Sequence, residues 1–343
     1  MSSNHPYRYL NIPKDAPIEL KPSAGKGWGV FAKQKIQRGA LILQEKPLFV
    51  IRKARADITE EDVGRAFQQL SPQQKQQFAL LRDNATRIFP CLLMAFAENC
   101  FNLASGSDAW VSLPPAEGLF LLHSRFNHSC LPNAKVPTGH VGDEIASFAT
   151  RDILAGEEIT ICYSPVFECL TRHERHQALG FTCDCRACLP GTPFQRLSDA
   201  RRRLSRGLQY LTHGVDVDVP SDGGLGTSSL SPAIVDPQLR RAAQNFDIPL
   251  TSRFIYEPLS AFLWAEEGLM DGFMFQRVTP GIRAVVGMFR TRENAAIARF
   301  ALVQDTWLER LNVAFRLYWR GDAADQSVAE GFRVMQLAAS LSS

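Results

Sequence analysis

Apolar residues occur in short runs from Ile18 to Ile51, and glycines separate these runs. The segments WGVFA and ALILQE are rich in branched and aromatic residues. Short apolar runs bounded by glycine predict β-strands rather than helices. Strand-like runs return in the segments Leu119–Phe126, Ala146–Thr150 and Glu158–Tyr163, where Ile159 and Ile161 alternate with polar neighbours. The pattern therefore predicts several small sheets built from distant parts of the chain.

The segment from about residue 52 to 104 has a different period. Apolar side chains recur there at helical spacing: Val63, Phe67, Leu70, Phe78 and Leu81. Ser71 and Pro72 have the form of an N-cap followed by a first-turn proline. We expect a helical insert that interrupts the strands.

The chain after residue 193 is predicted to be helical. Its clearest periodicity lies between Asn294 and Trp319, where one helical face would be apolar. Residues 214–232 are rich in Gly, Ser, Asp and Pro, which is typical of a long surface loop. Residues 1–17 show neither pattern and are expected to form an N-terminal arm. The predicted strands and helices together indicate a mixed α+β fold class.

Charge and hydropathy exclude some partners. The formal net charge is +3 over 343 residues, so we expect no direct binding to nucleic acid. The basic run Arg201, Arg202, Arg203 and Arg206 is expected to be a solvated helix face rather than a binding patch. The N-terminus lacks an apolar signal core, and no stretch reaches the length of a membrane span. We therefore expect no membrane association and an intracellular location, in the nucleus or the cytoplasm, and leave the oligomeric state open.

Three cysteines gather in the segment FTCDCRAC, at Cys183, Cys185 and Cys188. In a reducing compartment such a cluster is more typical of a metal site than of disulfides. Structural zinc takes four ligands, so one must come from elsewhere, and Cys130 in SRFNHSC is the natural candidate. A redox pair at Cys185 and Cys188 is the alternative, but no thioredoxin-like βαβ pattern surrounds it. We expect one structural zinc ion.

The order of motifs resembles that of SET-domain protein lysine methyltransferases. A KGWG segment opens a strand region, an insert follows, and then come RFNHSCLPN, GEEITICY and the Cys-x-Cys-x-x-Cys cluster. The similarity is to the SMYD branch and to fungal SET proteins, except that no MYND-type array of cysteine and histidine occurs in the insert. The resemblance implies a SET domain of small sheets at 18–180, a post-SET zinc segment at 181–193 and a helical C-terminal region at 194–343.

The resemblance also implies a binding site for S-adenosyl-L-methionine. The positions that match cofactor-binding residues of the family are Lys26, Gly27, Trp28, Gly29, Asn99, Ser124, Arg125, Asn127, His128, Tyr163 and Phe181. Tyr163 falls on the catalytic tyrosine. Phe101, Tyr163 and Leu179 correspond to the lysine channel. Leu179 departs from the branch, which often has a tyrosine at this position, so the channel loses one hydroxyl group.

The expected function is transfer of a methyl group from S-adenosyl-L-methionine to a lysine amine of a protein or peptide. The cofactor carries the activated methyl group, and the protein must align the amine with it. Two alternatives stay open. The same pocket could serve a small-molecule or biosynthetic acceptor, or the fold could be a non-catalytic binding scaffold.

Overall fold

The computed structural model describes residues 7, 10–81, 88–103, 115–137, 143–214, 241, 256–276, 279, 283, 292–293 and 296. The chain divides into two compact units. Residues up to Tyr163 belong to the first, and the second begins at Ser164. The loop predicted at residues 214–232 lies outside the described residues except for Gly214. The predicted helix at Asn294–Trp319 also lies outside them except for residue 296.

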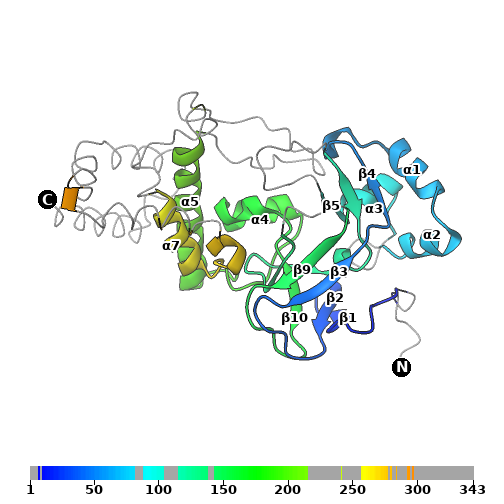
Figure 1. Ribbon diagram of the computed structural model, residues 1–343, viewed down its shortest axis with the longest axis horizontal. Helices are drawn as coiled ribbons and strands as arrows, with labels where there is room; N and C mark the ends of the chain where they lie inside the picture. The colour runs from blue at the N-terminus through cyan, green and yellow to red at the C-terminus, as the bar shows by residue number, and fades with distance from the viewer. Residues whose placement is uncertain are drawn as a thin grey trace. The chain divides into compact units, whose positions relative to one another are not determined.

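The first unit contains the strands of the KGWG and GEEITICY segments, which lie in one sheet (Figure 1). One sheet has the order β1-β2-β10-β7, with bounds Ile18–Ser23, Gly27–Ala32, Glu158–Ile161 and Asn127–His128. β2 is antiparallel to both of its neighbours, whereas β7 runs parallel to β10. The parallel pairing brings the end of GEEITICY beside the asparagine-histidine pair, although Tyr163 follows His128 by 35 residues.

Two further sheets of three strands complete the described part of this unit. The order β3-β9-β8 joins Leu41–Glu45, Ile145–Ala149 and Ala134–Lys135. The order β4-β6-β5 joins Phe49–Ile51, Glu117–Leu119 and Cys100–Asn102. Buried residues of the first two sheets share one core, which includes Ile18, Val30 and Ile159. Ile51 and Leu119 of the third sheet belong to a separate core.

The helical insert forms largely as predicted. Its helices are α1 (Glu60–Gln68), α2 (Pro72–Phe78) and α3 (Leu92–Ala97). Thr59 and Ser71 each complete a capping box at the start of a helix, which satisfies backbone N–H groups that the helix leaves free. The apolar faces of the three helices pack into a second core around Val63, Phe78 and Phe96.

Two parts of the strand and helix prediction are wrong. Cys100–Asn102 was placed in the helical insert but is strand β5, paired with β6. The predicted strand Leu119–Phe126 stops at Leu119, and His123–Arg125 forms a short 3-10 helix instead. Glu45 accounts for the turn, because its carboxylate accepts the backbone N–H groups of Leu122 and His123 at 2.9 Å each.

The second unit is helical in its described part. It contains α4 (Arg172–Leu179), α5 (Pro193–His213) and α7 (Glu257–Glu267). α5 packs on α7 through Leu208, Leu211 and Leu263. The basic run on α5 is not the solvated face that we expected, because Arg202 is 1% exposed and bonds the buried carboxylate of Glu267. Among the described helices, none combines the length and the apolar character needed to cross a membrane.

Candidate active site and metal centre

The KGWG segment lies where β2 approaches the asparagine-histidine strand. Gly27 has φ of 77°, which favours glycine, and Gly29 lies against two side chains. A Cβ atom on Gly29 would overlap Glu158 Oε1 and lie 2.7 Å from Asn127 Nδ2. A Cβ atom at position 29 would therefore force the ends of the Glu158 and Asn127 side chains to move.

Asn127 closes this approach with its amide group. Its Nδ2 donates to the Trp28 carbonyl oxygen at 3.2 Å and to Glu158 Oε1 at 2.7 Å. The other carboxylate oxygen of Glu158 forms an ion pair with Lys26 Nζ at 3.6 Å. Glu158 thus joins Lys26 to Asn127, and Asn127 in turn bonds Trp28. Glu158 was not predicted as a site residue, although it lies within GEEITICY.

Arg125 joins a second group of the predicted residues. Its Nη2 donates to Asn99 Oδ1 at 2.5 Å and to Ser124 Oγ at 3.2 Å, and its Nη1 donates to the Tyr7 hydroxyl at 2.8 Å. The guanidinium also lies 5.0 Å from the centre of the Tyr7 ring. Asn99 is held in turn by a bond from its Nδ2 to the Ala95 carbonyl at 2.8 Å. Tyr7 lay in the predicted arm, and no local pattern marked it.

The charge of Arg125 is buried without a carboxylate partner among the described residues. The residue is 6% exposed, and its Nε has no hydrogen-bond partner in the described structure. Burying a guanidinium is costly unless a negative group or a full set of hydrogen bonds compensates it. This arrangement suits an anionic ligand group.

Tyr163 directs its hydroxyl group inward at the end of β10. The hydroxyl donates to the Phe126 carbonyl oxygen at 3.0 Å, while the residue as a whole is 50% exposed. Burial of the hydroxyl raises the pKa of Tyr163 to about 12, with a smaller increase from the charge of Glu158 and a decrease from Arg125. The side chain is therefore a neutral hydrogen-bonding group at physiological pH.

His128 lies between Tyr163 and Cys130. The backbone N–H of Tyr163 donates to His128 Nδ1 at 3.2 Å, and His128 Nε2 lies 3.2 Å from Cys130 Sγ. Because a backbone N–H can only donate, Nδ1 must carry the lone pair, and the proton of the neutral ring is on Nε2. The ring thus presents an N–H group to the sulfur of Cys130, as suits a thiolate.

The predicted channel residues are only partly connected. Phe101 lies on β5 and meets the rings of Phe120 and His123 edge-on, at centroid distances of 5.8 and 6.0 Å. The His123 ring stacks on Phe126, whose carbonyl accepts the Tyr163 hydroxyl. Leu179 ends α4, and Phe181 follows it at 39% exposure, both in the second unit. The roles of these last two residues stay predictions.

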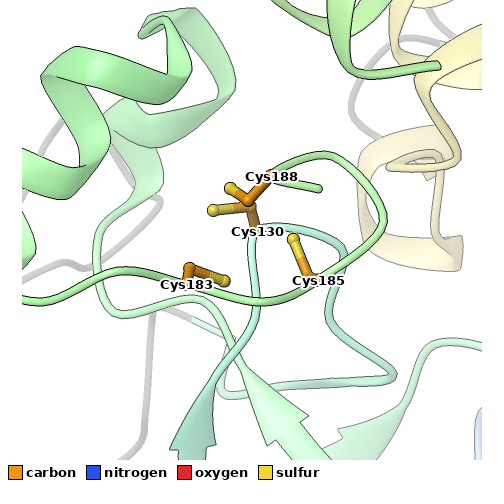
Figure 2. Close-up of side chains that lie close together, drawn as sticks. All are labelled: Cys130, Cys183, Cys185 and Cys188. Carbon is orange, nitrogen blue, oxygen red and sulfur yellow. The ribbon is translucent and has the colours of Figure 1, made fainter. Parts of the chain in front are cut away.

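The four predicted cysteine ligands come together (Figure 2). The sulfur atoms of Cys130, Cys183, Cys185 and Cys188 all lie within 4.8 Å of one another. Cys130 follows β7, whereas the other three come from the loop after α4. Three of the four are buried. His176 is not part of the cluster, but its Nε2 accepts the backbone N–H of Cys183 at 3.2 Å.

This geometry is consistent with metal binding. In a tetrahedral site with Zn–S bonds of about 2.3 Å, the sulfur atoms lie about 3.8 Å apart. The observed spacing would therefore contract by at most about 1 Å around an ion. The donor set and its burial fit structural zinc, and no disulfide joins these thiols.

Comparison with known proteins identifies the fold. Residues 27–164 match the model of the SET domain family. The chain is 29% identical over 188 residues to histone-lysine N-methyltransferase set5 of Schizosaccharomyces pombe, which covers 54% of each chain. It is 42% identical over 96 residues to histone-lysine N-methyltransferase SET5 of Meyerozyma guilliermondii, covering 26% of this chain and 19% of that protein. It is 41% identical over 80 residues to protein-lysine N-trimethyltransferase SMYD5 of Danio rerio, covering 21% of this chain and 19% of that protein.

These relatives are matched only in part, since the chain spans about half the length of the first and about a fifth of the other two. The matched family region begins at Gly27, within KGWG, and ends one residue after Tyr163. It contains the glycine segment, the asparagine-histidine pair, Cys130 and the strand that leads to the tyrosine. The chain therefore carries a SET domain, in agreement with the motif order of its sequence.

Proposed function

We propose that this chain transfers a methyl group from S-adenosyl-L-methionine to the side-chain amine of a protein lysine. The observation that carries the proposal is the position of Tyr163, which follows β10. Its hydroxyl group donates a hydrogen bond to the Phe126 carbonyl oxygen. The strand lies beside the asparagine-histidine pair of a SET domain. Similar proteins bear the names of histone-lysine and protein-lysine methyltransferases.

The cofactor would be held at the two groups of residues described above. Gly29 leaves room beside Asn127, and the backbone of the KGWG segment would lie against the ligand. The buried guanidinium of Arg125 would bind the carboxylate of the amino acid part, because it has an Nε without a described partner and no described carboxylate. Asn99 and Ser124 fix the direction of this guanidinium.

When bound, the cofactor supplies a methyl group on a sulfonium, which is already activated for transfer. The lysine amine must be neutral to react, and its reference pKa of about 10.4 means that it first loses a proton. Phe101 and Tyr163 would hold the neutral amine toward the methyl group, which the bound cofactor would give up while the C–S electron pair stays on its sulfur. Tyr163 would orient the amine through its oxygen, and the high pKa of its phenol makes it a poor source of a base.

Zinc would complete the structure at Cys130, Cys183, Cys185 and Cys188. The sulfur positions and their burial support this assignment. His128 adds a hydrogen bond from Nε2 toward Cys130, of the kind that outer residues supply to metal ligands. The zinc would then be structural, since four protein ligands leave no open position for catalysis.

The experiment is transfer of an isotopically labelled methyl group from the cofactor to proteins of a cell extract. We expect label in protein, and hydrolysis of that protein should release methyl-lysine. Tyr163→Phe should lower the labelling rate about 100-fold through loss of alignment, while cofactor binding changes little. Tyr256→Phe, at a buried tyrosine outside the SET domain match, is the matched control and should retain the rate.

Other outcomes would contradict the proposal in recognisable ways. Label in small molecules but not in protein would favour the small-molecule alternative. No binding of S-adenosyl-L-methionine or its demethylated product, measured by calorimetry on folded protein, would favour the scaffold alternative. Unaltered labelling by Tyr163→Phe would remove the role given to the tyrosine.

A further inference from the structure

Arg175 is the most completely buried charged side chain beside the cysteine cluster. It is the fourth residue of α4 and is 0% exposed. Thr171 starts this helix with a capping box, in which its hydroxyl and the Glu174 carboxylate satisfy the first backbone donors. Arg175 is thus buried although most residues of α4 are polar.

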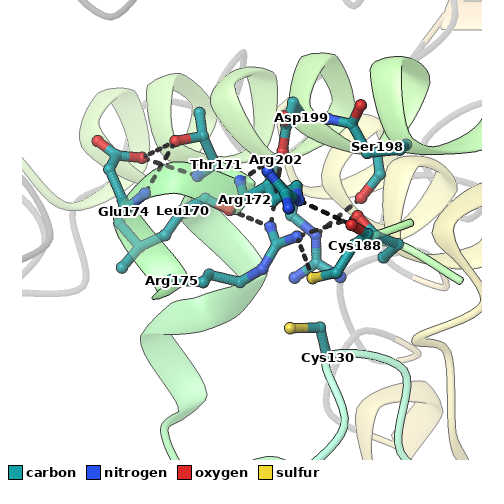
Figure 3. Close-up of polar contacts among 12 residues, drawn as sticks. Cys130, Leu170, Thr171, Arg172, Glu174, Arg175, Cys188, Ser198, Asp199 and Arg202 are labelled. Carbon is teal, nitrogen blue, oxygen red and sulfur yellow. Dashed lines mark hydrogen bonds and ion pairs between the residues drawn. The ribbon is translucent and has the colours of Figure 1, made fainter. Parts of the chain in front are cut away.

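The guanidinium of Arg175 is directed at the cysteine segment (Figure 3). Its Nη2 donates to Cys188 Sγ at 3.4 Å and to the Ala187 carbonyl at 3.3 Å, and its Nη1 donates to the Leu170 carbonyl at 2.5 Å. Asp199 Oδ1 lies 3.8 Å from Nη1, which makes an ion pair beyond hydrogen-bond distance. The sulfur of Cys188 is therefore nearer to the charge than this carboxylate is.

The neighbouring arginine of α4 also contacts this segment. Arg172 Nε donates to the Cys188 carbonyl oxygen at 2.7 Å, and the backbone N–H of Arg172 donates to Asp199 Oδ1 at 2.6 Å. The backbone and the sulfur of Cys188 are thus both held by arginines of one short helix. Such contacts fix the direction in which the sulfur points.

The charge of a four-thiolate zinc site explains why a buried cation belongs here. Four thiolates and one Zn²⁺ carry a net charge of −2, and three of the four cysteines are buried. A net charge in a low-dielectric interior is costly unless an opposite charge lies close to it. An arginine is always protonated in proteins, so Arg175 offers one fixed positive charge at the sulfur.

We propose that Arg175 is a positioning and charge-compensating residue of the metal centre, which orients the sulfur of Cys188 and thereby determines how firmly zinc is retained. This inference rests on the zinc assignment above and is independent of methyl transfer. Outer residues that bond metal ligands commonly change metal affinity by about 10–100-fold when they are replaced. Arg175 belongs to that class by its contact with Cys188.

The test measures zinc release from the full chain to a coloured chelator. Arg175→Met should release zinc at least about tenfold faster than the unaltered protein. Arg175→Lys keeps the charge but not the forked donors, and should fall between the two. Arg202→Met is the matched control, since Arg202 is 1% exposed and pairs with Glu267. It should lower the melting temperature but leave the rate of zinc release from folded protein unchanged.

The outcomes separate this inference from the function proposed above. Equal release rates for Arg175→Met and the unaltered protein would overturn it, whether or not the protein methylates lysine. Equal acceleration by Arg202→Met would also overturn it, because general loosening would then explain the effect. If Arg175→Met does not fold, cobalt-loaded Arg175→Lys decides, and a thiolate-to-cobalt absorption band identical to that of the unaltered protein would refute the contact with Cys188.

Discussion

The imidazole of His128 accepts the backbone N–H of Tyr163 at 3.2 Å, and the two rings lie 5.1 Å apart. The bond is possible because β7 and β10 run parallel, with His128 opposite Ile161. It anchors the chain where the tyrosine leaves the sheet. His128 therefore positions the backbone of the proposed catalytic residue and need not touch the substrate.

Replacing His128 should expose the importance of this bond. In His128→Leu the backbone N–H of Tyr163 loses its acceptor, so we expect the free energy of unfolding to fall by about 0.5–1.5 kcal/mol. In His128→Asn the side-chain oxygen can occupy a place close to that of Nδ1, and the loss should be smaller. Urea denaturation of both variants measures the difference. Equal losses would show that the acceptor is unimportant.

Arg125→Met should remove recognition of the carboxylate on the cofactor. We expect the unaltered protein to bind S-adenosylhomocysteine more tightly than methylthioadenosine, which lacks the amino acid part. A charge-assisted hydrogen bond contributes about 1.5–3 kcal/mol, so this preference should shrink about 10- to 100-fold in the variant. Calorimetry with the two ligands gives the ratio. A ratio that Arg125→Met leaves unchanged would place the carboxylate elsewhere.

Gly29→Ala should disturb the site by overlap with Glu158 and Asn127. We expect weaker cofactor binding and a loss of stability of about 1 kcal/mol, at the lower end of the range for overfilled regions, because the overlapping atoms are side-chain ends. Gly64→Ala is the control, because nothing lies within 4 Å of a Cβ at that position of α1. It should be neutral or slightly stabilising. Thermal melting and calorimetry compare the two, and similar behaviour would disprove the close approach.

The pH dependence of transfer should follow the lysine and not Tyr163. The rate should rise toward pH 10 as the amine loses its proton, without the decline that an ordinary tyrosine ionising near pH 10 would cause. The pKa of Tyr163 is about 12, so the folded protein keeps the phenol proton more tightly than the unfolded chain does. This contribution to stability is complete below pH 10 and is lost as the pH rises toward 12.

Single-turnover rates between pH 7 and 10.5 check this expectation, with fluorescence at each pH to confirm that the protein remains folded. A decline in rate near pH 10 in folded protein would mean that the tyrosine ionises with an ordinary pKa. Tyr163→Phe should give a lower curve of the same shape.

Metal analysis should give one zinc per chain, and Cys185→Ser should lose it. A four-ligand site that loses one thiolate binds the ion much more weakly, and structural zinc contributes directly to folding. Cys91→Ser is the control, because Cys91 lies outside the cluster and precedes α3. Zinc retained by Cys185→Ser at one ion per chain would contradict the ligand set.

Several features of this protein could be predicted from local sequence. Ser71 and Pro72 marked the start of α2, and short apolar runs with glycines marked β1 and β2, because caps and strand periodicity depend on neighbouring residues. The spacing of Cys183, Cys185 and Cys188 indicated a metal site that needed a fourth ligand, and the motif order indicated a SET domain. The boundary errors at Cys100–Asn102 and Leu119–Phe126 arose where pairing with distant chain decides the structure.

The sequence by itself determined the chemical groups of the site: the thiols, the asparagine-histidine pair and the tyrosine. Only the tertiary structure decided which polar side chains became buried and against what. Arg125 acquires Tyr7 and Asn99 as partners, and Arg175 acquires Cys188, although Arg175 lies in a helix of mostly polar residues. The physical reason is that the burial of a charge depends on compensating groups that other segments bring to it, and the local pattern of polar and apolar residues does not contain that information.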